Sequence, residues 1–216
     1  MALLLAPALR ADSLEDVLAR MDRAAAEFKS FSAKLKRVDF TAVLNESTEL
    51  TGEVAMRRVK GGNQALTKFD PPEPHEIYFA GRTMKRYYPK ANTVEIYDAG
   101  KLSATADQMM LLGFGISSGE LRKNYDLKLV GAENVGPTHA TRIELTPKSA
   151  EMRQKYVSKI DLWIPDGQGN PIQEKVISPS KNYFLVTYSD LKVNPSLPDS
   201  AYTLKLPPGV KELRPQ

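Results

Sequence analysis

The sequence has no cysteine, only two histidines and no apolar run long enough to span a bilayer. Without cysteine there can be no disulfide framework, no thiol nucleophile and no cysteine-based metal site. His75 and His139 have no second histidine at metal-ligand spacing. Gly113-Phe114-Gly115 lacks the lysine of a phosphate-binding loop. We therefore expect no enzyme and no cofactor.

What the chain does contain is typical of one soluble globular domain. It has 216 residues, of which 42% are hydrophobic and 26% charged, a composition that excludes a disordered or polytopic membrane protein. The formal net charge is +4, but 26 acidic residues are interspersed among 30 basic ones. That pattern differs from the clustered basic surface of a nucleic-acid-binding protein, and it is compatible with a mild attraction to anionic lipid head groups.

The first eleven residues resemble the end of a targeting segment. Residues 2–9 are apolar, and the small residues Ala6, Ala8 and Ala11 precede Asp12. A signal peptide that has lost its basic start would have this form, and the alternative is an ordinary frayed terminus. We predict a truncated signal peptide over residues 1–11 and a single domain over residues 12–216.

One helix followed by many strands is expected along the domain. Ser13 and Asp16 form a capping box, and apolar residues recur at helical spacing from residue 13 to about residue 31. The period then changes to two, which predicts a meander of strands within residues 33–44, 50–56, 65–69, 76–80, 83–88 and 93–97. The helix should therefore lead into an antiparallel sheet.

The alternation stops between residues 102 and 124, where two short helices are expected at 105–112 and 118–123. Strand patterns resume within 127–129, 143–145, 160–164, 172–177 and 183–188, with a short helix at 149–155 and Trp163 on the opposite face. The strand at 183–188 and the residues 194–210, on the two sides of a proline-containing turn, should close the antiparallel sheet. About eleven strands exceed what a flat open sheet holds. The predicted fold is mainly β with α: a strongly curved antiparallel sheet or unclosed β-barrel, with the N-terminal helix and a short helical lid on its concave face.

Four motifs resemble one known family. The ending from Asn194-Pro195 through Asp199-Ser200 to Val210 is similar to the C-terminus of the LolA-type outer-membrane lipoprotein carriers, and Ser30–Leu35, Gly52–Arg58 and Leu145–Lys148 also match family patterns. The resemblance implies a monomeric periplasmic chaperone without enzymatic activity. Such a carrier shields lipoprotein acyl chains and delivers them towards the outer membrane. Its implied partners are an inner-membrane lipoprotein-releasing transporter and an outer-membrane acceptor.

A hydrophobic cavity and a lid are the candidate site. The inward faces of the predicted strands would line the cavity floor with Val54, Met56, Ile143, Leu145, Ile160, Leu162, Phe184 and Val186. The insert would supply an adaptable apolar lid from Met109, Met110, Leu112 and Phe114. Plain core packing is the alternative for both groups of residues.

Arg58 and the Lys85-Arg86 pair are the polar residues of interest. Continuing the face of Val54 and Met56 by one step puts Arg58 on the inward side, and the resemblance implies that it latches the lid through backbone carbonyls. A bulge or a position at the solvent-exposed rim would instead leave Arg58 in solvent. Lys85-Arg86 stands where the family commonly has bulky apolar residues. This departure keeps open a different cargo, another amphiphile such as a glycolipid or isoprenoid. A lipid-sensing envelope-stress module is the second alternative.

Overall fold

One twelve-stranded sheet organises the computed structural model, which describes residues 12–60, 62–98 and 112–215. The strands are β1 (Ser30–Thr41), β2 (Glu46–Val59), β3 (Gly62–Phe69), β4 (Glu76–Ala80), β5 (Thr83–Tyr88), β6 (Thr93–Asp98), β7 (Tyr125–Val135), β8 (Thr138–Pro147), β9 (Lys159–Pro165), β10 (Gln173–Ile177), β11 (Tyr183–Val193) and β12 (Lys211–Leu213). The helices are α1 (Leu14–Glu27), α3 (Ser118–Asn124) and α4 (Ala150–Lys155), and two 3₁₀ turns are η1 (Pro89–Ala91) and η2 (Asp199–Tyr202).

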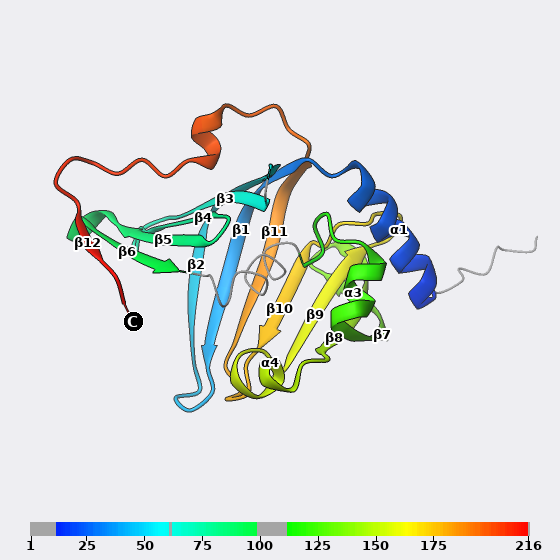
Figure 1. The fold of residues 1–216 in the computed structure, drawn as a ribbon. Helices are drawn as coiled ribbons and strands as arrows, with labels where there is room; N and C mark the ends of the chain where they lie inside the picture. Colours follow the sequence, from blue (N-terminus) through cyan, green and yellow to red (C-terminus); the bar gives the residue numbers. More distant parts are fainter. Residues whose placement is uncertain (1–11, 61, 99–111, 216) are drawn as a thin grey trace, which may run out of the picture.

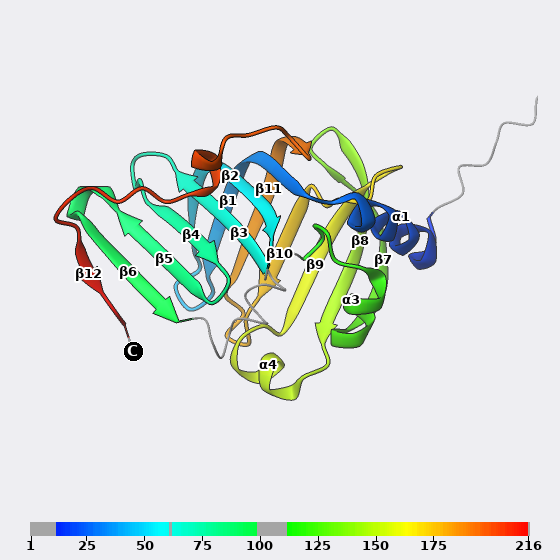
Figure 2. The same cartoon turned by 45° about the horizontal axis from the view of Figure 1, so that its top comes forward.

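The sheet consists of two meanders that meet in the middle. Its strand order is β12-β6-β5-β4-β3-β2-β1-β11-β10-β9-β8-β7. The chain steps outward from β1 to β6 and later steps back from β7 to β11, which pairs antiparallel with β1. β7 and β12 are the two edges of the described sheet and do not pair with each other, so the curled sheet does not close (Figures 1 and 2). The predicted mainly-β, unclosed barrel is thereby confirmed.

Helix α1 covers one half of the inner face. The Ser13 hydroxyl accepts the backbone N–H of Asp16 at 3.2 Å, which confirms the capping box. The Asp22 carboxylate accepts both the backbone N–H and the hydroxyl of Ser118 at 2.6 Å, so α1 is tied to the start of α3 (Figure 1). The prediction of a helix to about residue 31 was wrong, because Phe28 is already extended and β1 begins at Ser30.

Asn194 explains where α1 ends. Its side-chain oxygen accepts the backbone N–H groups of Lys29 at 2.7 Å and Ser30 at 3.1 Å, and its side-chain N–H donates to the Glu27 carbonyl at 2.9 Å. The Asn194 backbone has φ of 54°, a conformation that asparagine tolerates better than most residues. The first residue of the C-terminal motif thus joins the helix end to the end of β11.

Replacing Asn194 with alanine should lower the free energy of unfolding by roughly 2 kcal/mol, since it orphans two N–H groups and one carbonyl and strains the backbone. Denaturant unfolding followed by circular dichroism measures this change. Asn134, exposed on β7, provides the matched control, and its alanine variant should unfold like the wild type. Equal stabilities of the two variants would contradict the capping role.

The expected strand 183–188 does pair antiparallel, as part of β11, with β1 and β10, but the segment after β11 forms no antiparallel partner, so that half of the prediction was wrong. This segment runs along one end of the sheet to the far edge, where β12 pairs parallel with β6 (Figures 1 and 2). Four prolines, Pro195, Pro198, Pro207 and Pro208, remove the N–H donors that a paired strand would need. β12 is also a strand beyond the eleven expected.

Tyr202 anchors this C-terminal segment to the outer face of β2. Its ring is buried, and the Arg57 guanidinium lies 4.6 Å from the ring centre. Arg57 also forms an ion pair with Asp199 at 2.6 Å. The Asp-Ser-x-Tyr motif therefore has a packing role in this chain.

The short helices α3 and α4 confirm the predictions at 118–123 and 149–155. The expected signal peptide at 1–11 and the helix at 105–112 fall outside, or almost wholly outside, the described residues, and both stay predictions. Among the helices that the structure describes, none has the length and apolar character needed to cross a membrane.

Candidate functional site

The inner face of the sheet divides into a covered half and an open half. On the covered half, α1 and residues 112–121 pack onto β7 to β10. Four of the predicted floor residues lie in this packed core, each at most 1% exposed: Ile143, Leu145, Ile160 and Leu162. Leu112, a predicted lid residue, packs among them. These five side chains therefore belong to the core beneath α1 and do not face an open space.

The open half forms a cavity of about 320 Å³, which we call the inner cavity. Four predicted floor residues line it: Val54, Met56, Phe184 and Val186. The remaining walls were not predicted and come mainly from β1 and β3 to β5, with Phe31, Leu35, Thr67, Phe69, Ile77, Phe79, Met84 and Tyr188. Their period-two spacing could have identified them, since it continues the inward face of strands already recognised.

Phe114 stands between the two halves. Its ring stacks on Phe31 with centroids 4.2 Å apart and contacts Tyr188 edge-on at 5.5 Å. Phe31 and Tyr188 both line the inner cavity. The described end of the insert thus reaches this cavity, whereas Met109 and Met110 lie outside the described residues.

Arg58 joins β2 to the insert. Its Nη2 donates to the Gly115 carbonyl, its Nη1 donates to the Phe28 carbonyl at 3.5 Å, and its guanidinium lies 5.6 Å from the centre of the Phe28 ring. Gly115 has φ of +70°, and a Cβ there would come within 2.6 Å of Phe28 and 2.8 Å of Arg58. Glycine is therefore required at position 115, where Arg58 donates a hydrogen bond to the insert.

Arg37 and Glu174 are two of the charged residues that line the inner cavity. Arg37 is paired with Asp39 through bonds of 2.7–3.0 Å and lies 4.6 Å over the Phe184 ring. Glu174 on β10 is only 6% exposed and stands opposite Leu162 and Val186. Burial raises the pKa of Glu174 to about 8, so the carboxyl is mainly neutral at pH 7.

A second hollow of about 540 Å³, which we call the outer hollow, adjoins the inner cavity. The two spaces share four lining residues: Arg37, Phe69, Ile77 and Arg86. The lining of the outer hollow is more polar and is completed by Asp39, Leu50, residues 72–75, Tyr88, Lys90 and Ala91. An amphiphilic ligand could therefore occupy both spaces at once, with its apolar part inside.

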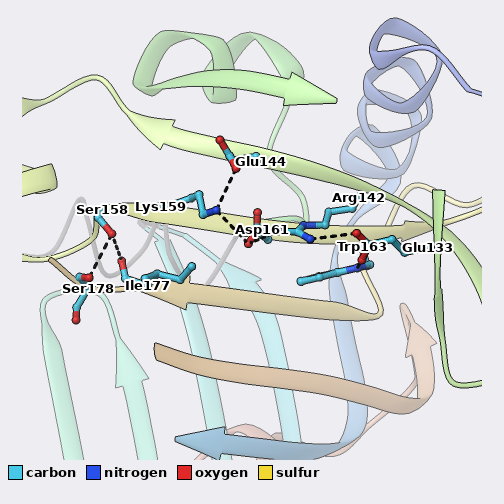
Figure 3. A network of polar contacts seen from close by, with 9 residues as sticks. All are labelled: Glu133, Arg142, Glu144, Ser158, Lys159, Asp161, Trp163, Ile177 and Ser178. Carbon is cyan, nitrogen blue, oxygen red and sulfur yellow. Dashed lines mark hydrogen bonds and ion pairs between the residues drawn. The ribbon is translucent and has the colours of Figure 1, made fainter. Parts of the chain in front are cut away.

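A separate polar network lies on the opposite face of the sheet (Figure 3). Arg142 pairs with Glu133 at 3.0 Å and with Asp161 at 3.1 Å, and the Trp163 indole donates to Glu133 at 2.8 Å. The prediction that Trp163 faces away from the core is confirmed. Within residues 12–60, 62–98 and 112–215, no cluster of three potential metal ligands occurs. We assign this network a structural role.

The sheet is thus an unclosed barrel with an apolar cavity on its concave face. By sequence, the chain matches no protein-family model and no curated protein. Among solved structures it is similar to an uncharacterized conserved protein of Thermus thermophilus, with 11% identity, coverage of 94% of this chain and 100% of that chain, and a TM-score of 0.56. It is also similar to MucB, with 16% identity over 88% of this chain and 62% of MucB, and a TM-score of 0.52.

The matched structures include a LolA superfamily protein of Nitrosomonas europaea, with 16% identity, coverage of 90% of this chain and 99% of that chain, and a TM-score of 0.41. MucB from Pseudomonas aeruginosa is also known in complex with MucA. Identities this low show a shared fold and nothing finer. The structure has the unclosed barrel that the resemblance to LolA-type carriers implied, and membership of that family stays a prediction.

Proposed function

We propose that the protein is a periplasmic carrier that shields acyl chains in the inner cavity and delivers their lipoproteins towards an outer membrane. The observation that carries this proposal is the apolar inner cavity on the concave face of an unclosed barrel. Each methylene moved from water into such a cavity gains roughly 0.8 kcal/mol, so an acyl chain needs a shelter of this kind in transit. The fold-level likeness to MucB, a protein known in complex with MucA, supports a binding function.

Arg58 would set how tightly the carrier holds its cargo. In the structure its guanidinium bonds the Gly115 carbonyl and so holds the insert against β2. Cargo that displaces the insert must break this hydrogen bond. The free energy of cargo binding is reduced by the cost of moving the insert, so the cargo binds less tightly. Weakened binding of this kind lets an acceptor take the cargo.

Replacing Arg58 with leucine is expected to slow the release of a fluorescent acyl ligand about tenfold, because the closed state loses charge-assisted hydrogen bonds. Stopped-flow fluorescence after mixing with acceptor vesicles measures the release rate. Arg82, exposed in the turn before β5, offers a control, and its leucine variant should release the ligand at the wild-type rate. An unchanged rate in the Arg58 variant would argue against the latch.

The carrier proposal is tested by adding the purified protein to spheroplasts that contain radiolabelled lipoproteins and a compatible releasing transporter. Release of labelled lipoprotein into a soluble complex would support the proposal, with an inert protein of similar size as the control. No release would favour the alternative cargo, another amphiphile. Arg86 is the residue that favours this alternative, because it puts a cation at the edge of the cavity.

A further inference from the structure

Arg86 occupies the boundary between the inner cavity and the outer hollow, and it lines both. It lies on β5 with Ile77 opposite it on β4 and Glu95 opposite it on β6. Its side chain is half-buried, and its Nε is buried without a hydrogen-bond partner in the part of the chain that the structure describes. The guanidinium bonds the Tyr88 hydroxyl at a long 3.5 Å.

Neighbouring charges do not neutralise Arg86. Glu95, the acid opposite it, accepts the Tyr97 hydroxyl at 2.8 Å, and within the described residues Arg86 forms no ion pair. The other cations of the outer hollow are already bound: Arg37 to Asp39 and Lys90 to the Pro72 carbonyl at 2.7 Å. Arg86 therefore carries a half-buried positive charge that lacks a carboxylate partner.

Burial disfavours the charge of Arg86, whereas the Tyr88 hydroxyl and Glu95 favour it, and its Nε still has no hydrogen-bond partner among the described residues. Removing a guanidinium from water costs free energy that only a well-placed partner repays. The planar guanidinium has five donors in a fork that matches the two oxygens of a carboxylate or phosphate. The open space beside Arg86 is the shared border of the two hollows, so such an anion has room there.

We propose that the cargo is an anionic amphiphile, whose acyl chain fills the inner cavity and whose carboxylate or phosphate head group binds Arg86 at the border with the outer hollow. This inference rests on the proposed carrier function, takes up its alternative cargo, another amphiphile, and names the chemistry of that ligand. The apolar walls formed by Phe69, Ile77 and Met84 lie beside the same arginine. One ligand can therefore satisfy both surfaces. A free anion would use only Arg86, and the proposal excludes it as the natural ligand.

The test compares two probes that differ in charge alone. cis-Parinaric acid is a fluorescent fatty acid, and its methyl ester has the same chain without the anion. At pH 7 the acid should bind the wild-type protein roughly tenfold more tightly than the ester, the expected gain from a charge-assisted hydrogen bond. Dodecyl phosphate should displace the probe more effectively than dodecanol, and inorganic phosphate should not displace it.

Arg86→Met should reduce the acid-to-ester ratio to about one while leaving the affinity for the ester unchanged. Lys85→Met is the matched control, because Lys85 is adjacent on β5, carries the same charge and points to the other face of the sheet. Its ratio should stay at the wild-type value. Arg86→Lys keeps the charge but loses the fork, and it should give an intermediate ratio.

The outcomes separate this inference from the carrier proposal. Equal binding of acid and ester by the wild-type protein would overturn the inference alone, whatever the variants do. The inference would also be overturned if Arg86→Met and Lys85→Met lowered the ratio equally, or if inorganic phosphate competed as well as dodecyl phosphate. If neither acid nor ester binds, the proposed function fails together with the inference.

Discussion

Replacing Arg142 with methionine is expected to lower the free energy of unfolding by roughly 3 kcal/mol, because the change removes one partner of a buried ion pair. Asp161 is 1% exposed, and its Oδ1 has no hydrogen-bond partner among the described residues. Its Oδ2 accepts from Arg142 at 3.1 Å (Figure 3), whereas Lys159 is 4.0 Å away and is engaged with Glu144 at 3.1 Å. Methionine would leave the Asp161 charge with this distant partner alone.

A double variant distinguishes two causes of the stability loss: the unpaired charge of Asp161 and the lost packing of Arg142. Changing Arg142 to methionine and Asp161 to leucine together removes both ions, so stability should recover most of the loss. Arg82→Met, on the exposed turn before β5, controls for the loss of a surface arginine and should change stability by less than about 0.5 kcal/mol. Urea unfolding gives all three values. A single variant as stable as the wild type would show that the network contributes little.

Periodicity predicted the architecture because it reports local geometry. The period-two segments placed β4 at 76–80 and β5 at 83–88, and the structure has the same bounds. The capping box of Ser13 and Asp16 marked the start of α1 correctly. The end of α1 was missed because Asn194, remote in sequence, bonds Lys29 and Ser30 and diverts the chain into the sheet. Long-range contacts of this kind leave no local pattern.

The division of the inner face could not be predicted for the same reason. Ile143 and Val54 both point inward from their strands, but α1 covers the first and leaves the second beside the cavity. Alternation tells which face a side chain occupies and not what lies above it. Arg86 was noticed as a departure from the family, and its inward position follows from the spacing with Met84. The burial of Glu174 was not predicted, because a single acidic residue in a strand pattern does not show which side chains surround it.

Glu174 should make the protein less stable as the pH rises from about 5 to above 8. Burial raises the pKa of its carboxyl from 4.5 to about 8. The unfolded chain therefore loses this proton at lower pH than the folded protein does. Below the pKa of the unfolded chain the carboxyl is protonated in both states, and the free energy of unfolding does not depend on its titration. At higher pH only the unfolded chain loses the proton, so the free energy of unfolding falls until the folded carboxyl also ionises near pH 8. The shift corresponds to roughly 5 kcal/mol.

Glu174→Gln should remove this dependence, because glutamine stays neutral at every pH. The variant is expected to gain stability relative to the wild type between pH 5 and pH 8.5, with a difference in melting temperature that grows by roughly 10 °C. Scanning calorimetry at several pH values measures it. Glu46→Gln, at the exposed start of β2, should follow the wild-type profile.

The comparison is specific because other titrating groups are common to both proteins. His75 and His139 contribute equally to the wild type and the variant, so the difference between the two curves isolates Glu174. Tyr188 and Tyr125 lie near this carboxyl, and burial first and the Glu174 charge second raise the pKa values of both phenols, so they stay neutral over this range. Parallel curves would mean that the carboxyl is solvated in the cavity. Divergence would show that the cavity keeps an acid neutral at pH 7, as a shelter for acyl chains requires.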